Sequence, residues 1–335
     1  MKKILITGGA GYIGSHTAVE LVKAGFLPII IDDLSNSDIG VLDRLKEITG
    51  QELPFYKGNC GDKALLNQVS EDHQISGVIH FAAFKAVGES TEEPLKYYRN
   101  NVGGLISLLD FMQENNIRDI VFSSSCTVYG QPDTLPVTED TPRKDAESPY
   151  GNTKKICEDI LVDVVKSKVG LRVISLRYFN PVGAHESSKI GELPKGKPNN
   201  LVPFVTQTAA GIREKLTVFG GDYETPDGTC IRDYIHVVDL ADAHLRAIQY
   251  LEGQTQDFYD VFNVGTGRGN TVLEVIQSFE KVSGKKLNYE IGPRRPGDVI
   301  KVWADTTKIN DLLGWYPKKS LDDSMRDSWN WQKSL

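Results

Sequence analysis

Short apolar runs alternate with helix-like patterns along the first half of the chain. Several runs are apolar at every position, as strands buried on both faces of a sheet require. The expected strands lie at residues 3–7, 27–32, 53–57, 77–83, 119–125 and 171–179. Helical patterns separate them, at residues 12–25, 38–48, 62–72, 93–116 and 149–168. This alternation predicts an α/β fold with a Rossmann-type, doubly wound parallel sheet.

The pattern changes after residue 180. Residues 180–200 are rich in Gly, Pro and Asn and have no clear period, and a loop of this length is usually functional. Beyond it we expect helices at 200–213, 239–252, 271–283 and 321–333, and strands at 216–219 and 260–264. We therefore expect one domain over residues 1–180, with about 233–265 returning to it. Residues 181–335 would form a smaller mixed α/β domain that packs on the first and makes a cleft.

Composition narrows the class of protein. The chain has 335 residues, of which 40% are hydrophobic and 25% charged, as in an average soluble protein. A net charge of -7 without a basic run disfavours nucleic-acid or anionic-membrane partners, but not small anions. The N-terminal apolar run is too short for a signal peptide, and none approaches the roughly 20 residues of a membrane span. The four cysteines form no C-x-x-C pair, which is typical of free thiols in a reducing compartment; they are Cys60, Cys126, Cys157 and Cys230. We expect a cytoplasmic protein.

A glycine-rich segment follows the first expected strand. Gly8, Gly11 and Gly14 form a G-x-x-G-x-x-G pattern that opens a helix. Such glycines permit a tight turn and let backbone N–H groups approach a pyrophosphate at the positive helix end. Asp32 ends the next strand, at about the spacing of a carboxylate that binds the adenosine ribose, and no arginine follows it at once. The pattern favours NAD over NADP, and the alternative is a tight turn without a ligand.

Two further patterns could carry chemistry. Three serines, residues 123–125, stand at the expected end of a strand, where they either line a cofactor crevice or cap their own backbone. The next helix has Pro149 at its start and carries Tyr150 and Lys154 on one face, at a spacing also found in surface pairs. A positive charge about 5 Å away contributes roughly 3 kcal/mol toward the about 4 kcal/mol that brings a tyrosine pKa from about 10 to about 7. With this lysine and an oxidised nicotinamide nearby, Tyr150 could act as a general base, and Ser125 could orient the same hydroxyl.

We expect no metal site. His236, Asp239 and His244 gather in one segment, but Asp239 before an apolar helical run is typical of a helix N-cap. Cys126 follows the serine strand, and no motif places a histidine beside it. We interpret Cys126 as a packing residue rather than a nucleophile.

Together these motifs are similar to those of the extended short-chain dehydrogenase/reductase superfamily, and the whole chain resembles its UDP-glucose 4-epimerase family. The resemblance implies a tightly bound NAD that is not consumed. A tyrosine would take the proton of the sugar 4-hydroxyl while hydride passes from C4 to NAD, and the 4-keto sugar would turn before hydride returns. A homodimer through helices 93–116 and 149–168 is also implied, although their apolar faces could instead meet only their own sheet. The matching segments, over roughly residues 4 to 305, are "TGGAGYIGSH", "HFAAFKAVGES", "YYRNNVGG", "SSSCTVYG", "SPYGNTKK", "LRYFNPVGAH", "PNNLVPF", "GTCIRDYIHVVDLADAH", "FNVGTG" and "PRRPGD".

The resemblance also implies roles for single residues. The catalytic residues would be Ser125, Tyr150 and Lys154. These three would also contact NAD, together with Gly8, Gly11, Tyr12, Ile13, Gly14, Asp32, Asn36, Ser37, Asn59, Cys60, Phe81, Ala82, Ala83, Lys85, Asn100 and Phe179. The nucleotide sugar would contact Lys85, Ser125, Tyr150, Asn180, Asn200, Leu201, Val218, Phe219, Arg232, Arg295, Asp298 and Val302. A pair of arginines from separate segments suits a diphosphate, because each forms charge-assisted hydrogen bonds with its oxygens.

Three positions depart from the family pattern. Asn59 stands where the family commonly has Asp, and Ala83 stands where Gly is frequent. Val302 precedes "WAD", where enzymes limited to UDP-glucose and UDP-galactose often have a tyrosine. If this side chain walls the sugar pocket, valine leaves more room near C2. N-acetylated UDP-hexoses would then also be substrates.

Other functions remain open at this point. A 4,6-dehydratase commonly has an acidic pair where Cys126 and Thr127 stand, so elimination would lack its acid and base. A related epimerase acting on UDP-glucuronate or a UDP-pentose would differ in loops that the pattern does not place. A non-catalytic NAD-binding regulator need not keep Ser125, Tyr150 and Lys154.

Overall fold

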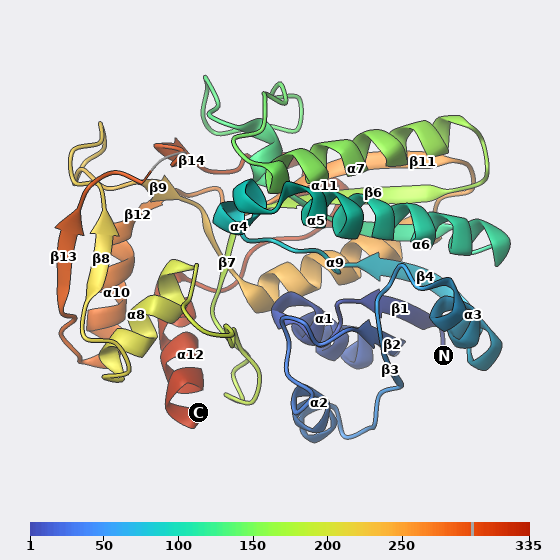
Figure 1. The fold of residues 1–335 in the computed structure, drawn as a ribbon, viewed down its shortest axis with the longest axis horizontal. Coiled ribbons are helices and arrows are strands. Elements are labelled where there is room, and N and C mark those ends of the chain that lie inside the picture. The colour runs from blue at the N-terminus through green and yellow to red at the C-terminus, as the bar shows by residue number, and fades with distance from the viewer. Residues whose placement is uncertain (296–297) are drawn as a thin grey trace.

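The computed structural model describes residues 1–295 and 298–335. At its centre lies a seven-stranded sheet in the order β11-β6-β5-β4-β1-β2-β3 (Figure 1). Its strand pairs are all parallel, which confirms the predicted Rossmann-type α/β fold. The strands are β1 (Lys3–Thr7), β2 (Leu27–Asp32), β3 (Phe55–Lys57), β4 (Ile75–His80), β5 (Asp119–Ser125), β6 (Arg172–Tyr178) and β11 (Phe258–Val264).

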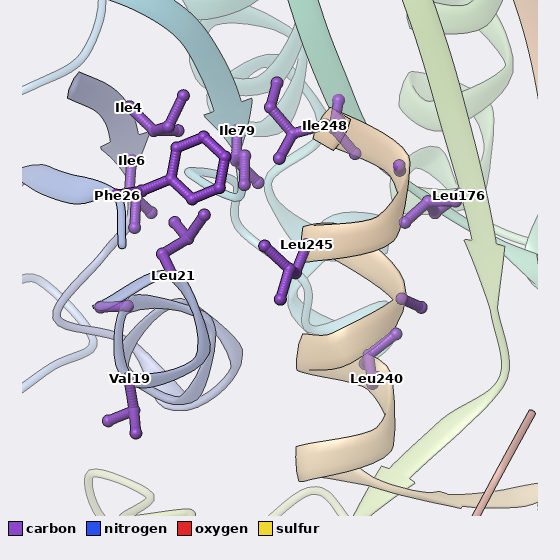
Figure 2. Packing of buried hydrophobic residues seen from close by; sticks show 14 of the residues in the cluster. Ile4, Ile6, Val19, Leu21, Phe26, Ile79, Leu176, Leu240, Leu245 and Ile248 are labelled. Carbon is purple, nitrogen blue, oxygen red and sulfur yellow. The ribbon is translucent and has the colours of Figure 1, made fainter. Parts of the chain in front are cut away.

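Helices cover both faces of this sheet. One face carries α1 (Tyr12–Lys23), α2 (Val41–Thr49) and α9 (Val237–Glu252), and the other carries α3 (Lys63–Asp72), α6 (Gly103–Glu114) and α7 (Pro149–Lys166). Successive side chains of β1 divide between the two cores: Ile4 and Ile6 face α1 and α9, whereas Leu5 faces α6 and α7. In Figure 2, Ile4, Ile6 and Ile79 of the sheet meet Leu21 of α1 and Leu245 and Ile248 of α9.

The C-terminal part adds three small sheets and a separate core. β7 (Asn180–Val182) pairs with β10 (Tyr234–His236), and β8 (Leu216–Phe219) pairs with β13 (Tyr289–Gly292). β9 (Ile231–Arg232) lies between β12 (Asn270–Thr271) and β14 (Lys301–Val302). The helices there are α8 (Leu201–Ala209), α10 (Val272–Ser283), α11 (Thr307–Leu313) and α12 (Leu321–Ser334). Because β11 returns to the edge of the main sheet, the chain crosses between the two parts more than once (Figure 1). The division into two domains at residue 180 stays a prediction.

The helix predicted over residues 93–116 is confirmed, but it contains a π turn that the sequence did not predict. The segment divides into α5 (Pro94–Tyr97), a π-helical turn at Tyr98–Val102 and α6, and α4 (Val87–Glu92) precedes it. The amide of Asn101, within the π turn, donates to the Phe84 carbonyl (3.0 Å) and accepts from the Phe84 N–H (2.9 Å). This exchange ties the turn to the segment after β4, a tertiary constraint that a helical period does not reveal.

The predicted N-cap of α9 is wrong. The helix begins earlier, and its N-cap is His236, whose Nδ1 accepts from the N–H of Val238 (3.1 Å). Asp239 lies inside the first turn, where its carboxylate accepts from the N–H groups of Lys318 (3.0 Å) and Lys319 (2.9 Å). The residue that looked like a cap therefore fixes the segment before α12 to α9.

Candidate active site

The glycine turn after β1 is tightly packed and leaves a helix end open. Gly8 has φ +73°, and a Cβ there would lie 2.8 Å from the backbone nitrogen of Ala82. A Cβ on Gly14 would lie 2.3 Å from the Gly8 carbonyl oxygen. Gly11 caps α1 without a side-chain hydrogen bond, so the first N–H groups of α1 are not covered by a cap. This is the geometry that a pyrophosphate requires.

Asp32 ends β2 facing this turn. Its carboxylate is 8% exposed and accepts from the N–H of Ala10 (3.0 Å), the N–H of Leu34 (2.9 Å) and the hydroxyl of Ser37 (2.7 Å). These donors hold the carboxylate beside the glycine turn, where a ribose would follow a bound pyrophosphate. The turn and Asp32 therefore fit a dinucleotide without a 2'-phosphate.

Only one of the three serines at the end of β5 has its hydroxyl toward the candidate reacting groups. The Ser123 hydroxyl bonds to the Tyr178 phenol, and the Ser124 hydroxyl donates to Glu158 (2.6 Å). Ser125 instead lies within hydrogen-bonding reach of the Tyr150 phenol and accepts from the Thr127 N–H (3.2 Å). Partners on β6 and α7 satisfy the first two hydroxyls, so of the three only Ser125 has its hydroxyl toward the candidate reacting groups.

Tyr150 and Lys154 stand at the start of α7. Ser148 is the N-cap of this helix, and Pro149 occupies its first turn, as the sequence predicted. The Lys154 ammonium is buried, donates to the Ser123 carbonyl (2.6 Å) and lies 4.9 Å from the centre of the Phe122 ring. Both side chains therefore face the carboxyl end of β5.

Burial dominates the ionisation of both groups. It raises the pKa of Tyr150 to about 12, and the hydrogen bond with Ser125 acts in the opposite direction. It lowers the pKa of Lys154 to about 8. In the protein alone the phenol is thus neutral at pH 7, and a further positive charge is needed to make it a base near neutrality.

The other predicted cofactor residues surround the carboxyl ends of β1, β2 and β4. Phe81 and Ala82 hydrogen-bond the Thr7 carbonyl through their N–H groups, over 3.0 and 3.1 Å. Cys60 and Phe179 are buried, which leaves little of either side chain for a ligand. Tyr12, Ile13, Ala83 and Asn100 are half-buried, whereas Asn36, Asn59 and Lys85 are exposed.

The predicted diphosphate arginines meet at one carboxylate. Arg295 donates to Asp298 (2.6 Å), and Arg232 lies 3.6 Å from the same oxygen. Residues 296–297 of the "PRRPGD" motif lie outside the described residues. The arginines come from separate segments, as a clamp on a diphosphate requires.

The remaining predicted substrate residues divide by burial. Val218 is 1% exposed and belongs to the core under β8, so its side chain is not available to a ligand, whereas Phe219 next to it is exposed. Val302 is buried against Phe179 and Tyr129. Half-buried or exposed positions at the junction of β7 and α8 are Asn180, Asn200 and Leu201.

Glu192, which the sequence did not single out, joins two of the predicted sites. Its carboxylate oxygen Oε1 accepts from Asn200 (2.6 Å) and lies 3.5 Å from the Lys85 ammonium. Trp331 of α12 donates to its backbone carbonyl (3.0 Å). Glu192 lies in the loop before α8, where no period or motif marks it, so only the folded chain reveals this link.

Three findings bear on the metal site, the cysteine nucleophile and the membrane span that the sequence argued against. In the part of the chain that the structure describes, no group of His, Cys, Asp and Glu residues is arranged to hold a metal ion. Burial raises the pKa of Cys126 to about 12, which leaves its thiol a poor nucleophile. Across residues 1–295 and 298–335, no helix is long and apolar enough to cross a membrane.

Comparison with known proteins decides the family. A sequence model described as GDP-mannose 4,6 dehydratase matches residues 5–328. A UDP-glucose 4-epimerase of Neisseria meningitidis serogroup C is 51% identical over 331 residues, which cover 99% of this chain and 97% of the relative. The chain belongs to the UDP-glucose 4-epimerase family. The predicted family and enzyme class are therefore confirmed.

Solved structures of the family have the same fold. The UDP-glucose 4-epimerase of Bifidobacterium longum in complex with NAD+ and UDP superposes with a TM-score of 0.95 at 46% identity, covering 99% of this chain and 98% of its own. An epimerase of Stenotrophomonas maltophila with bound NAD and formylated UDP-arabinopyranose superposes with a TM-score of 0.97 at 45% identity, covering 100% and 98%. The likeness extends over both parts of the chain, including the segments that carry the predicted UDP site.

Proposed function

We propose that the protein interconverts UDP-glucose and UDP-galactose by NAD-dependent 4-epimerisation through a transient 4-keto sugar. The observation that carries this proposal is the arrangement of Ser125, Tyr150 and Lys154 at the carboxyl end of β5, in a chain of this family. When bound, oxidised NAD would supply the positive charge that favours a tyrosinate and a reversible acceptor for the C4 hydride. Gly8, Gly14 and Asp32 fit this cofactor by their packing and hydrogen bonds.

The protein's own groups handle the proton. Ser125 orients the sugar 4-hydroxyl, and Tyr150 takes its proton as the ketone forms. The phenol keeps that proton in its buried position and gives it back when C4 is reduced, so no exchange with solvent is needed. Lys154 stabilises the tyrosinate by its charge, which requires that the ammonium stay protonated. Because its pKa is about 8, this condition is met at pH 7.

The UDP moiety holds the substrate while the 4-keto sugar turns. Arg232 and Arg295 exchange the Asp298 carboxylate for diphosphate oxygens, while Phe219 and the start of α8 flank the nucleoside. Binding at the diphosphate leaves the hexose free to rotate, which a 4-keto intermediate needs to present its second face. The clamp therefore provides affinity without fixing the sugar.

A cytoplasmic homodimer is part of the proposal. The four cysteines are free, in keeping with a reducing compartment. Leu105, Leu108, Leu109 and Met112 of α6 are buried against the protein's own sheet, so they are not available to a partner. Ile106 on the same helix is 46% exposed. We assign the dimer contact to this outer face of α6 and to α7.

N-acetylated UDP-hexoses are a second candidate substrate class. Val302 is 5% exposed and lies in one hydrophobic cluster with Tyr129 and Phe179. Tyr129 follows Ser125 by four residues, and Phe179 directly precedes Asn180. A valine fills less volume than a tyrosine at this wall. We infer that the pocket accepts a 2-acetamido group, and turnover of UDP-N-acetylglucosamine and UDP-N-acetylgalactosamine would test this.

One assay separates the proposal from its rivals. The purified protein is given UDP-galactose without added NAD, and formation of UDP-glucose is followed by chromatography, with UDP-glucuronate and UDP-arabinopyranose as parallel substrates. We expect conversion of UDP-galactose by wild type and a loss of about 10²–10⁴-fold in the Tyr150→Phe variant. Tyr316→Phe, at a position that is 56% exposed, should be normal.

The other outcomes are equally informative. Turnover of the acidic or pentose sugar alone would make the protein a related epimerase. Absence of turnover with every sugar would favour an NAD-binding regulator. A Tyr150→Phe variant with normal rates would refute the assignment of the base.

A further inference from the structure

Glu158 is a buried carboxylate on α7 that the proposed reaction does not use. It lies one helical turn beyond Lys154, and its side chain is 1% exposed. Ser124 donates to Oε1 (2.6 Å), and Arg177 donates through Nε to Oε1 (2.9 Å) and through Nη2 to Oε2 (2.6 Å). Arg143 adds a longer bond to Oε2 (3.4 Å). The carboxylate thus binds β5, β6 and the segment before α7 together.

These bonds fix α7 against β5 at the level of the reacting groups. Glu158 binds the side chain of Ser124, the residue immediately before Ser125. Lys154, one turn earlier, donates to the carbonyl of Ser123. Two consecutive turns of the helix are therefore attached to two consecutive residues of the strand. A shift of α7 along β5 would move the tyrosine phenol away from the serine hydroxyl, and small displacements of reacting groups are costly.

The carboxylate also affects the charge on Lys154. Burial lowers the pKa of Lys154 to about 8, while Cys157 and Glu158 act to raise it. Burial raises the pKa of the Cys157 thiol to about 12, so this group is neutral at pH 7 and Glu158 is the anion of the two. Without Glu158, the guanidinium of Arg177, which is 5% exposed, would lack its buried counter-ion. An unpaired positive charge would lower the pKa of Lys154 further.

The other groups around Lys154 supply no negative charge at neutral pH. On β4, burial and then the Lys154 charge lower the pKa of His80 to about 3, so its ring is neutral. On β5, the ammonium meets the Ser123 carbonyl and the Phe122 ring. On β6, burial raises the pKa of Tyr178, whose phenol bonds to the Ser123 hydroxyl. Among these neighbours, Glu158 is the group whose charge can hold the proton on Lys154.

We propose that Glu158 is a positioning residue for the epimerase reaction. Its carboxylate keeps Tyr150 and Lys154 of α7 in register with Ser125 of β5, and it keeps Lys154 protonated at neutral pH. The assignment rests on the proposed function, because it concerns the same reacting groups. The Glu158 carboxylate lies between α7 and the sheet among protein atoms, so it acts through Ser124 and Lys154 rather than on the substrate.

Glu158→Gln tests this assignment against Asp159→Asn. Asp159 follows Glu158 on the same helix and also bonds to Arg143 (2.7 Å), but its side chain is 56% exposed. In Glu158→Gln we expect kcat to fall roughly tenfold or more while the KM for UDP-galactose changes little. The alkaline limb of the kcat profile should move to lower pH, since Lys154 loses its proton earlier. Asp159→Asn should match wild type in kcat, in KM and in the pH profile. A wild-type kcat and pH profile in Glu158→Gln would overturn the proposal.

A second readout does not depend on turnover. Lysines labelled with ¹³C at Cε are titrated by NMR in the purified protein, and the Lys154 signal is assigned by its loss in Lys154→Met. We expect the Lys154 signal to titrate near pH 8 in wild type and in Asp159→Asn. In Glu158→Gln we expect its titration midpoint to lie at a lower pH. An unchanged titration would refute the charge effect even if wild type proves inactive on UDP-galactose, an outcome that would separately refute the proposed function.

Ser124→Ala keeps the test decisive if Glu158→Gln does not fold. This variant removes the bond between β5 and Glu158 but leaves the pair with Arg177 in place. We expect a lower kcat with an unmoved Lys154 titration. A wild-type kcat would refute the positioning role.

Discussion

Among single side chains, Val302 gives the proposed turnover of N-acetylated sugars its most direct test. It is buried beside Phe179 and Tyr129, and β14 places it next to Arg232 of β9. If Val302 walls the sugar pocket, as we propose, a tyrosine there would fill the space that a 2-acetamido group needs. We expect Val302→Tyr to lower kcat/KM for UDP-N-acetylgalactosamine about tenfold to a hundredfold, and that for UDP-galactose by much less.

The comparison is made within each variant, as the ratio of the two kcat/KM values in steady-state assays. Val302→Ile, which adds one methylene, should change this ratio only slightly. A ratio in Val302→Tyr equal to that of wild type would show that this side chain does not wall the sugar pocket. Equal losses on both substrates would indicate overpacking of the core instead.

For single residues, the sequence predicted the candidate reacting groups better than it predicted the side-chain contacts that hold them. Tyr150 and Lys154 could be recognised because their spacing, Pro149 and the preceding serines all stand close together in the chain. The partner of Ser124 could not, because Glu158 reaches it from a distant segment, where Arg177 in turn binds the Glu158 carboxylate. A carboxylate one turn beyond Lys154 was visible in the sequence, but nothing local distinguishes a buried glutamate from an exposed one.

Among the elements, α1 and its glycine turn depend most on the absence of side chains. Both Gly14 and Gly88 lie in helices, so alanine at either position gains about 0.5–1 kcal/mol of helix propensity. At Gly14 the new Cβ would lie 2.3 Å from the Gly8 carbonyl oxygen, whereas nothing lies within 4 Å at Gly88. Overpacking of this kind costs about 1–3 kcal/mol. We expect Gly14→Ala to lose bound NAD, with at least about tenfold weaker affinity, and to melt at a lower temperature.

Gly88→Ala is the matched control, and it should keep its cofactor and melt at or slightly above the wild-type temperature. NAD released from heat-treated protein is measured by chromatography and divided by protein concentration. Full NAD content in Gly14→Ala would mean that the turn can relax around the added methyl group, contrary to its packing.

The elements that the sequence predicted correctly are those whose pattern is local. Continuous apolar runs predicted the buried strands, because helices on both faces of the sheet exclude water from every strand position. The helix that contains α5 and α6 was predicted, but its π turn was not, because Asn101 bonds to Phe84 outside the helix and no helical period reveals that contact. Asp239 was assigned wrongly for a related reason: its backbone partners at Lys318 and Lys319 are distant in the chain.

At the scale of the whole molecule, the outer face of α6 tests the proposed dimer. Ile106 of α6 and Leu312 of α11 are helical side chains of almost equal exposure, 46% and 47%. In a symmetric dimer each substitution acts twice. If Ile106 is buried by a second copy, its loss costs about 1.5–3 kcal/mol per protomer, and a buried aspartate adds to this.

Ile106→Asp should therefore be monomeric at micromolar concentrations, while Leu312→Asp should remain dimeric, as judged by size-exclusion chromatography with light scattering. Tyr150 and Lys154 lie on α7, which packs in the same core cluster as α6, so separation of the protomers should also lower kcat. A dimeric Ile106→Asp would place the contact elsewhere on the surface. A wild-type monomer would remove the dimer from the proposal and leave the reaction, whose residues all come from one chain, unaffected.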